Sequence, residues 1–249
     1  MKCTLTTGLA LATLLSTASA VTISDDFNDG NDTGWTHYEP LSGFGSGGTY
    51  TFPGGNSYNI ATSAPSPNPG GLGPARAGSF RNDATYTDFT MSVDVLGWDI
   101  AQPDMMIGLL GRTTQIGLGS TDGYAVLLDV GGSFAIQTIT NEAGSATLAG
   151  ALVSLNPAND YRIVFGASGT NFTALLYDLT NPGPPISTIS GSDATYASGV
   201  NGLFVYDSSS GGNQTAAANF DNYSTIPEPG SATLAGLAAA ALLRRRRRA

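Results

Sequence analysis

The chain has 249 residues, of which 33 are Gly and 13 are Pro, and only 12% are charged. So few Glu, Lys and Arg residues argue against a helical bundle, while 41% hydrophobic residues argue against global disorder. Residues 21–226 carry 18 of the 19 acidic residues but only four of the ten basic ones, which argues against nucleic acid as a partner because phosphate binding depends on Lys and Arg.

The first 20 residues predict a secretory signal peptide with a short apolar helix. Lys2 supplies the positive start, residues 5–15 form an apolar run, and Ala18 and Ala20 are the small residues that signal peptidase needs before its cut. Cys3 lies inside this segment. The exported chain would therefore begin at Val21 and would have neither disulfides nor a thiolate metal site.

Residues 21–225 predict one all-β domain. Within 86–98, Phe89, Met91, Val93 and Val95 alternate with mostly polar residues, which is the period of a strand with one buried face. Segments 105–112 and 124–130 are apolar throughout, as central strands packed on both faces would be. Further strands are predicted at 134–139, 161–165, 172–177, 200–206 and 216–223, with loops at 43–48 and 63–74. The favoured arrangement is a two-sheet antiparallel jelly-roll sandwich.

The C-terminal segment, residues 226–249, has three parts in a distinctive order. A Pro-Glu-Pro motif precedes an apolar run of about 14 residues, which is shorter than the roughly 20 residues that a stable membrane helix needs, and five arginines follow. This order resembles the PEP-CTERM sorting signal of exopolysaccharide-producing bacteria. The resemblance implies a sorting peptidase of the exosortase type, a transient membrane anchor, and a final place in the cell envelope or extracellular matrix. The residues are Pro227, Glu228, Pro229, Arg244, Arg245, Arg246, Arg247 and Arg248.

Three stretches of the predicted sandwich resemble the laminin-G and concanavalin A-like jelly roll. Residues 25–30 followed by Trp35 resemble its opening, residues 86–95 resemble its first long central strand, and residues 218–223 resemble its closing strand. The order and separation of these stretches carry the resemblance. The same fold serves lectins, glycosidases, adhesins and inert spacers, so the function is not decided by the fold.

A calcium site is predicted where the first and last strands are expected to meet. Asp26, Asn28 and Asp29 crowd a short turn, and Asp221 lies in the predicted closing strand. Calcium takes six to eight oxygen ligands from such side chains, and the resemblance implies that a calcium ion often joins these two strands. The alternative is a solvated Asp/Asn/Gly turn, because turns favour the same residues.

A catalytic site is not expected. The resemblance extends to glucanases of this fold, which carry a Glu-x-Asp-x-x-Glu strand whose two Glu residues act as nucleophile and acid/base. When Asp94 is matched to the central Asp, Ser92 and Gly97 stand at the Glu positions. The best remaining carboxylate pair is Asp94 with Asp99, and the single histidine, His37, lacks a nucleophile motif beside it.

A glycan-binding surface is the favoured prediction. Sugar faces stack on aromatic rings, with polar side chains around them. We expect Asp94 and Arg112 on neighbouring strands, with Tyr124, Gln137 and Trp98 as companions if the strands pair in sequence order. The alternative is that the rings fill the interior and that Asp94 and Arg112 form a structural ion pair.

Together these features predict an exported, non-catalytic bacterial surface or matrix protein that associates with extracellular polysaccharide. Two alternatives stay open, a glycan-active hydrolase on the same fold and a structural coat protein without a specific ligand. The predicted partners are signal peptidase, the sorting peptidase and a glycan, with calcium as the only candidate cofactor.

Overall fold

The computed structural model describes residues 21–62, 72–98, 105–207 and 215–228, with the side chain of Trp98 left out. The predicted signal and sorting helices, with Ala18, Ala20, Pro229 and the five arginines, lie outside this part. Within it the only helices are two short 3-10 turns, η1 (Ser42–Phe44) and η2 (Pro53–Gly55), and neither is long and apolar enough to cross a membrane.

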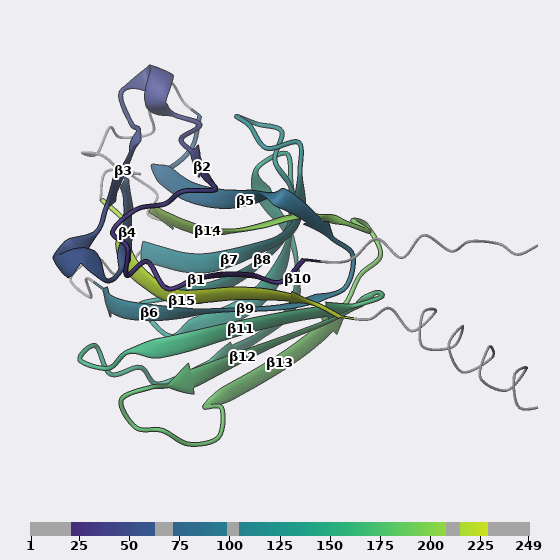
Figure 1. Ribbon diagram of the computed structural model, residues 1–249. Helices are drawn as coiled ribbons and strands as arrows, with labels where there is room; N and C mark the ends of the chain where they lie inside the picture. Colours follow the sequence, from purple (N-terminus) through teal and green to yellow (C-terminus); the bar gives the residue numbers. More distant parts are fainter. Residues whose placement is uncertain (1–20, 63–71, 99–104, 208–214, 229–249) are drawn as a thin grey trace, which may run out of the picture.

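Two antiparallel sheets pack face to face (Figure 1). Sheet A has the order β13-β12-β11-β6-β15-β4-β3, with β1 also paired to β15. Its strands are β1 (Ile23–Asp25), β3 (Gly48–Thr51), β4 (Tyr58–Thr62), β6 (Phe89–Trp98), β11 (Tyr161–Ser168), β12 (Asn171–Asp178), β13 (Ser187–Ser192) and β15 (Ala217–Pro227). This order joins the N-terminal strand to the closing strand, as the sequence predicted.

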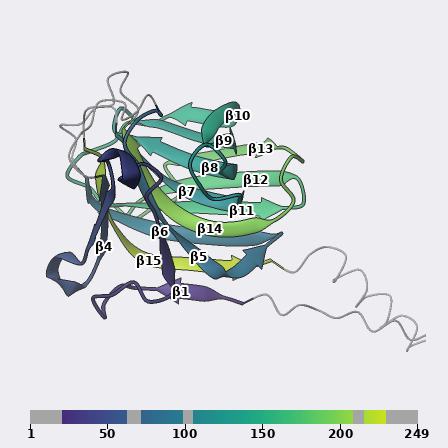
Figure 2. The ribbon, with the colours of Figure 1, turned by 90° about the horizontal axis from the view of Figure 1, so that it is seen from above.

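Sheet B has the order β10-β9-β8-β7-β14-β5-β2 (Figures 1 and 2). Its strands are β2 (Trp35–Tyr38), β5 (Arg76–Tyr86), β7 (Met105–Thr114), β8 (Asp122–Asp129), β9 (Ser133–Thr140), β10 (Ala143–Leu152) and β14 (Gly199–Asp207). Strands β7, β8 and β9 pair in sequence order, but β6 and β7 lie in different sheets. That separation affects the predicted ligand surface, because Asp94 belongs to β6 and Arg112 to β7.

The main core lies between the sheets and is built by alternation. On β6 the residues Phe89, Met91, Val93 and Val95 are fully buried against it, so the predicted register of this strand is confirmed. At one end an aromatic group closes the core, with the Phe27 ring 4.9 Å from Tyr58. The prediction of an all-β, two-sheet jelly roll is therefore confirmed.

The two described ends of the chain meet at one turn. The Tyr86 hydroxyl donates a hydrogen bond to the carbonyl of Val21 at 3.0 Å, and the backbone N–H of Glu228 donates to the carbonyl of Asp88 at 3.1 Å. Strand β15 continues to Pro227, two residues beyond the predicted boundary at 225. The first two residues of the Pro-Glu-Pro motif are thus attached to the sandwich.

Candidate functional site

The outer face of sheet B, which is turned away from sheet A, carries a second apolar cluster. Side chains of β7 and β8 alternate between this cluster and the main core, and both strands are therefore buried at almost every position. The prediction that these two strands are packed on both faces is confirmed. Two hollows remain over this face, and such an apolar surface is typical of a binding site. The buried members of the cluster are Tyr38, Phe80, Leu110, Ala125, Leu127 and Phe204.

Two glycines allow two rings of this cluster to pack directly against the backbone of the sheet. A Cβ on Gly108 would lie 2.3 Å from Cε1 of Phe204, and a Cβ on Gly202 would lie 2.6 Å from Cδ1 of Phe80. Both rings therefore lie against bare backbone. Tyr38 meets Phe80 edge-on, with 5.6 Å between ring centroids, which is a favourable aromatic geometry.

A polar bridge crosses the outer face and joins its two edges. Glu142, at the turn between β9 and β10, accepts hydrogen bonds from Nε and Nη2 of Arg76 on β5, at 2.8 and 2.7 Å. Its carboxylate also accepts bonds from the hydroxyl of Tyr38 on β2 and from the backbone N–H of Gly119, the latter at 2.6 Å. We call these three side chains, together with loop 115–121, the bridge.

The turn that presents Glu142 is unusual for its residue type. Asn141 and Glu142 have φ of 51° and 69°, as the two central residues of a type I′ hairpin require. A side chain in the left-handed region costs about 1 kcal/mol or more. Backbone bonds from Asn141 N–H to Oδ1 of Asp122 and from Glu142 N–H to the carbonyl of Thr121 hold the turn, at 2.8 and 2.7 Å. The turn thus aims the carboxylate at the opposite edge of the sheet.

The charges of the bridge are fixed by their contacts. Burial by itself would raise the pKa of Glu142, but the hydrogen bonds from Arg76, Gly119 and Tyr38 outweigh it and hold the pKa below its usual value. Burial would lower the pKa of Arg76, yet the same carboxylate raises it. Burial and the nearby carboxylate raise the pKa of Tyr38 well above its ordinary value. At neutral pH the bridge is therefore an ionised pair with a neutral phenol.

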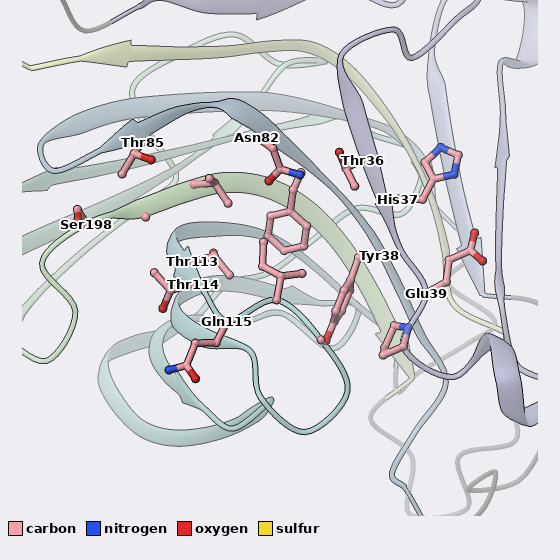
Figure 3. Close-up of a pocket in the computed structure, with 16 residues that line it drawn as sticks. Thr36, His37, Tyr38, Glu39, Asn82, Thr85, Thr113, Thr114, Gln115 and Ser198 are labelled. Atoms are coloured by element: carbon pink, nitrogen blue, oxygen red, sulfur yellow. The ribbon is translucent and has the colours of Figure 1, made fainter. Parts of the chain in front are cut away.

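One hollow, the polar groove, has a volume of about 710 Å³ and lies beside Tyr38 (Figure 3). Tyr38 and Phe80 supply its rings. At its base the hydroxyl of Thr113 is buried and has no hydrogen-bond partner among the described residues. The groove thus combines aromatic surface with many donors and acceptors. Its other polar side chains belong to Thr36, His37, Glu39, Asn82, Thr85, Thr114, Gln115 and Ser198.

The other hollow, the apolar pocket, has a volume of about 570 Å³ and also meets Tyr38. The two hollows share only this residue, so the bridge separates them. Phe204 and Tyr206 stack in the pocket with ring planes 9° apart and centroids 5.8 Å apart. Its apolar lining comes from Leu72, Pro74, Ala77, Leu110, Leu118, Leu127, Ile139, Ala143, Phe204 and Tyr206.

The five residues predicted to form one ligand surface do not come together. Asp94 lies on the outer face of sheet A, where Nε and Nη2 of Arg162 bind its carboxylate at 2.5 and 2.8 Å and Nδ2 of Asn222 donates to it at 3.0 Å. The expected Asp94–Arg112 pair is wrong, because β6 and β7 lie in different sheets. The partner is instead Arg162 of β11, which lies opposite Asp94 in the register of β11 with β6.

Arg112 and Tyr124 have structural positions. Arg112 is 2% exposed, and its guanidinium donates to the carbonyls of Thr87, Tyr196 and Gly169 at 2.7, 3.2 and 2.7 Å. The Tyr124 ring is fully buried between the sheets. The alternative that the rings fill the interior therefore holds for Tyr124, whereas Arg112 is buried with Asp88 rather than Asp94 as its carboxylate neighbour. Among the four whose side chains are described, Gln137 lines a hollow, the apolar pocket. The side chain of Trp98 is outside the described part.

Comparisons with known proteins bear on the fold. No protein-family model matches the chain, and no curated protein matches its sequence. Among solved structures, the carbohydrate-binding module CBM66 from Bacillus subtilis is similar, with a TM-score of 0.54, 20% identity, and coverage of 78% of this chain and 96% of that one.

Lectin II from Ulex europaeus gives a TM-score of 0.55 at 10% identity over 83% of this chain and 97% of that one. A β-1,3-1,4-glucanase from a mouse hindgut metagenome gives a TM-score of 0.59 at 13% identity, over 84% of this chain and 100% of that one. The fold is that of the concanavalin A-like lectins and carbohydrate-binding modules. At such identities the similarity establishes the fold alone.

The predicted calcium ligands make local hydrogen bonds, although burial raises the pKa of Asp221 and the carboxylate of Asp26 lies near enough to add to that effect. Oδ1 of Asp26 accepts from the backbone N–H of Asn28 at 3.2 Å, and Oδ1 of Asp29 accepts from that of Asn31 at 3.2 Å, as in ordinary turns. Asp221 instead contacts Asn222. No group of three or more acidic, His or Cys side chains that could hold a metal occurs in the described residues. The VIP36 luminal domain, whose structures include a calcium-bound form, shares the fold.

Sequence reasoning missed the bridge. It gave no role to Glu142, Arg76 or Tyr38. Arg76 and Glu142 are 66 positions apart, and Tyr38 and Glu142 are 104 positions apart. The sequence predicted no strand between residues 139 and 161, so the hairpin at Asn141-Glu142 and the strand β10 that follows it were not recognised.

Proposed function

We propose that this domain is a non-catalytic glycan-binding module and that the sugar lies in the polar groove. The observation that carries the proposal is the composition of that groove. Rings from Tyr38 and Phe80 meet nine hydroxyl, amide, imidazole and carboxylate side chains on one sheet face. Sugars present both C–H faces that stack on rings and hydroxyls that exchange hydrogen bonds, so this combination matches their chemistry.

Two exposed amides support the same proposal. Asn82 and Gln115 line the groove and are exposed. The side-chain nitrogen of Gln115 donates to Oδ2 of Asp122 at 2.8 Å, so its amide is held in place and leaves its oxygen to accept from a ligand. The amide of Asn82 can both donate to and accept from a sugar hydroxyl.

The carboxylates favour binding over hydrolysis. A retaining glycosidase needs two carboxyl groups about 5–5.5 Å apart, one of them protonated to act as the acid. Glu39 is the only acidic residue among the described residues that line the polar groove. Glu142 lines the other hollow, and its lowered pKa keeps it ionised. Asp94 is held by Arg162 on the other sheet, and Asp99 is outside the described residues.

A glycan array with residues 21–228, followed by calorimetric titration of the best ligand, tests the proposal. Asn82→Ala and Gln115→Ala should each weaken binding about fivefold, the value of one neutral hydrogen bond. Thr173→Ala on the outer face of sheet A is the matched control and should bind as the wild type does. An array without any signal would favour the coat-protein alternative, and release of reducing sugar from a bound glycan would establish the hydrolase.

We also propose that the chain is exported and sorted by its two ends. Val21 and Glu228 lie beside the same turn of the sandwich, so processing at both ends leaves the strands intact. Exported protein should begin at Val21 by intact mass. Removal of residues 229–249 should shift the protein from the cell envelope to the medium without lowering its melting temperature. An equal distribution of the full-length and truncated forms would contradict the sorting role.

A further inference from the structure

We infer that the apolar pocket is a second binding site and that it takes a neutral apolar group, aromatic or acyl, with one carbonyl or hydroxyl oxygen. This site is independent of the glycan in the polar groove, because the bridge lies between the two hollows. Its volume of about 570 Å³ falls in the range of small-molecule pockets. Close packing would have filled a purely structural cluster.

The lining determines that the ligand is apolar. Leu110, Leu127 and the stacked rings of Phe204 and Tyr206 line the pocket. The hydroxyl of Tyr206 is already directed at Sδ of Met106, 3.0 Å away. A ring or acyl chain placed here would exchange contact with water for contact with these side chains, which is favourable in proportion to the apolar area removed from water.

The bridge determines that the ligand is neutral. Glu142 accepts two hydrogen bonds from Arg76, one from Tyr38 and one from the backbone of Gly119. The remaining nitrogen of Arg76, Nη1, donates to the carbonyls of Leu72 and Pro74 at 3.2 and 2.8 Å. The two charges of the pocket thus neutralise each other, and four of the five guanidinium N–H groups and both carboxylate oxygens are already engaged. A charged ligand would find no opposite charge here and would lose its hydration.

Two amides are left to orient the ligand. The side chains of Gln137 and Asn141 line the pocket, and neither makes a hydrogen bond within the described part of the chain. An apolar pocket with a small number of such polar groups is the usual form of a specific small-molecule site. Amide N–H groups donate to a carbonyl or hydroxyl oxygen, so a ligand with one such oxygen fits better than a pure hydrocarbon.

Two neutral fluorescent probes test the inference. Prodan is a naphthalene with one propionyl carbonyl, and N-phenyl-1-naphthylamine is of similar size without a carbonyl. Both should bind residues 21–228 saturably at one site per chain, with increased fluorescence. Gln137→Leu should weaken prodan binding about fivefold and leave N-phenyl-1-naphthylamine binding unchanged. An equal effect on both probes would overturn the orienting role of Gln137.

Pocket filling locates the site. Ile139→Trp should reduce the affinity for both probes at least tenfold, while Leu152→Trp, at a residue 87% exposed on β10, should bind them as the wild type does. Asn82→Ala in the polar groove should also leave the probes unaffected, so failure of the glycan proposal and failure of this one are distinguishable. Absence of saturable binding, or unchanged binding by a folded Ile139→Trp variant, would overturn the inference.

Discussion

Glu142 joins β2, β5 and loop 115–121 over the outer face of sheet B through its hydrogen bonds. Its replacement by leucine should strongly lower the free energy of unfolding. The substitution removes four hydrogen bonds that converge on one carboxylate. It leaves the guanidinium of Arg76 without its counter-ion and the hydroxyl of Tyr38 without its nearest acceptor. The side chains of Arg76 and Glu142 are only 13% and 8% exposed, so water replaces little of what is lost.

The expected cost is about 3 kcal/mol at neutral pH. Removal of one partner from a buried ion pair costs about 3–5 kcal/mol, and the lower end applies because Nη1 of Arg76 keeps its bonds to two carbonyls. For a domain of this size that corresponds to a decrease of roughly 6–12 °C in melting temperature. Replacing both residues, Arg76→Leu with Glu142→Leu, should cost much less than the sum, because no unpaired charge remains.

The measurement is urea unfolding of the wild type, both single variants and the double variant, at neutral and acidic pH. The folded pKa of Glu142 lies below its usual value of 4.5, so its contribution is present above the unfolded pKa and is lost as the pH falls through the folded pKa. The difference between wild type and Glu142→Leu should therefore narrow below pH 4. Additive single effects, or a difference that does not change with pH, would refute the bridge as an ionic unit.

Three further predictions concern the rest of the domain. Arg112→Leu leaves three backbone carbonyls without donors and should lower the free energy of unfolding by about 3 kcal/mol. A loss below about 1 kcal/mol would show that water replaces the guanidinium. Gly108→Ala displaces the Phe204 ring from the sheet backbone. It should lower the free energy of unfolding by about 2 kcal/mol and weaken probe binding in the apolar pocket, and a neutral effect would contradict this packing. Calcium at millimolar concentration, added after chelation, raises the melting temperature only if Asp26 and Asp221 share an ion; an unchanged melting temperature would refute the predicted calcium site.

The sequence predicted those strands whose residues alternate or are apolar throughout. Strand β6 was found from Phe89 to Val95, and β7 and β8 were recognised as buried on both faces. It missed β10, where Ala143 to Leu152 are mostly small residues with an exposed face. Such a strand is held by hydrogen bonds to β9 and carries almost no hydrophobic period of its own.

The sequence by itself determined the fold class and the acidic, cysteine-free character of the domain, because alternation and composition are local or global properties of the chain. Only the tertiary structure decided which side chains meet. It separated Asp94 from Arg112 by placing β6 and β7 in different sheets, and it brought Glu142 to Arg76 across the outer face of sheet B. The reason is physical: an ion pair between distant strands of a sheet depends on strand order and on the loops that cross the face, and no periodicity in the sequence records either.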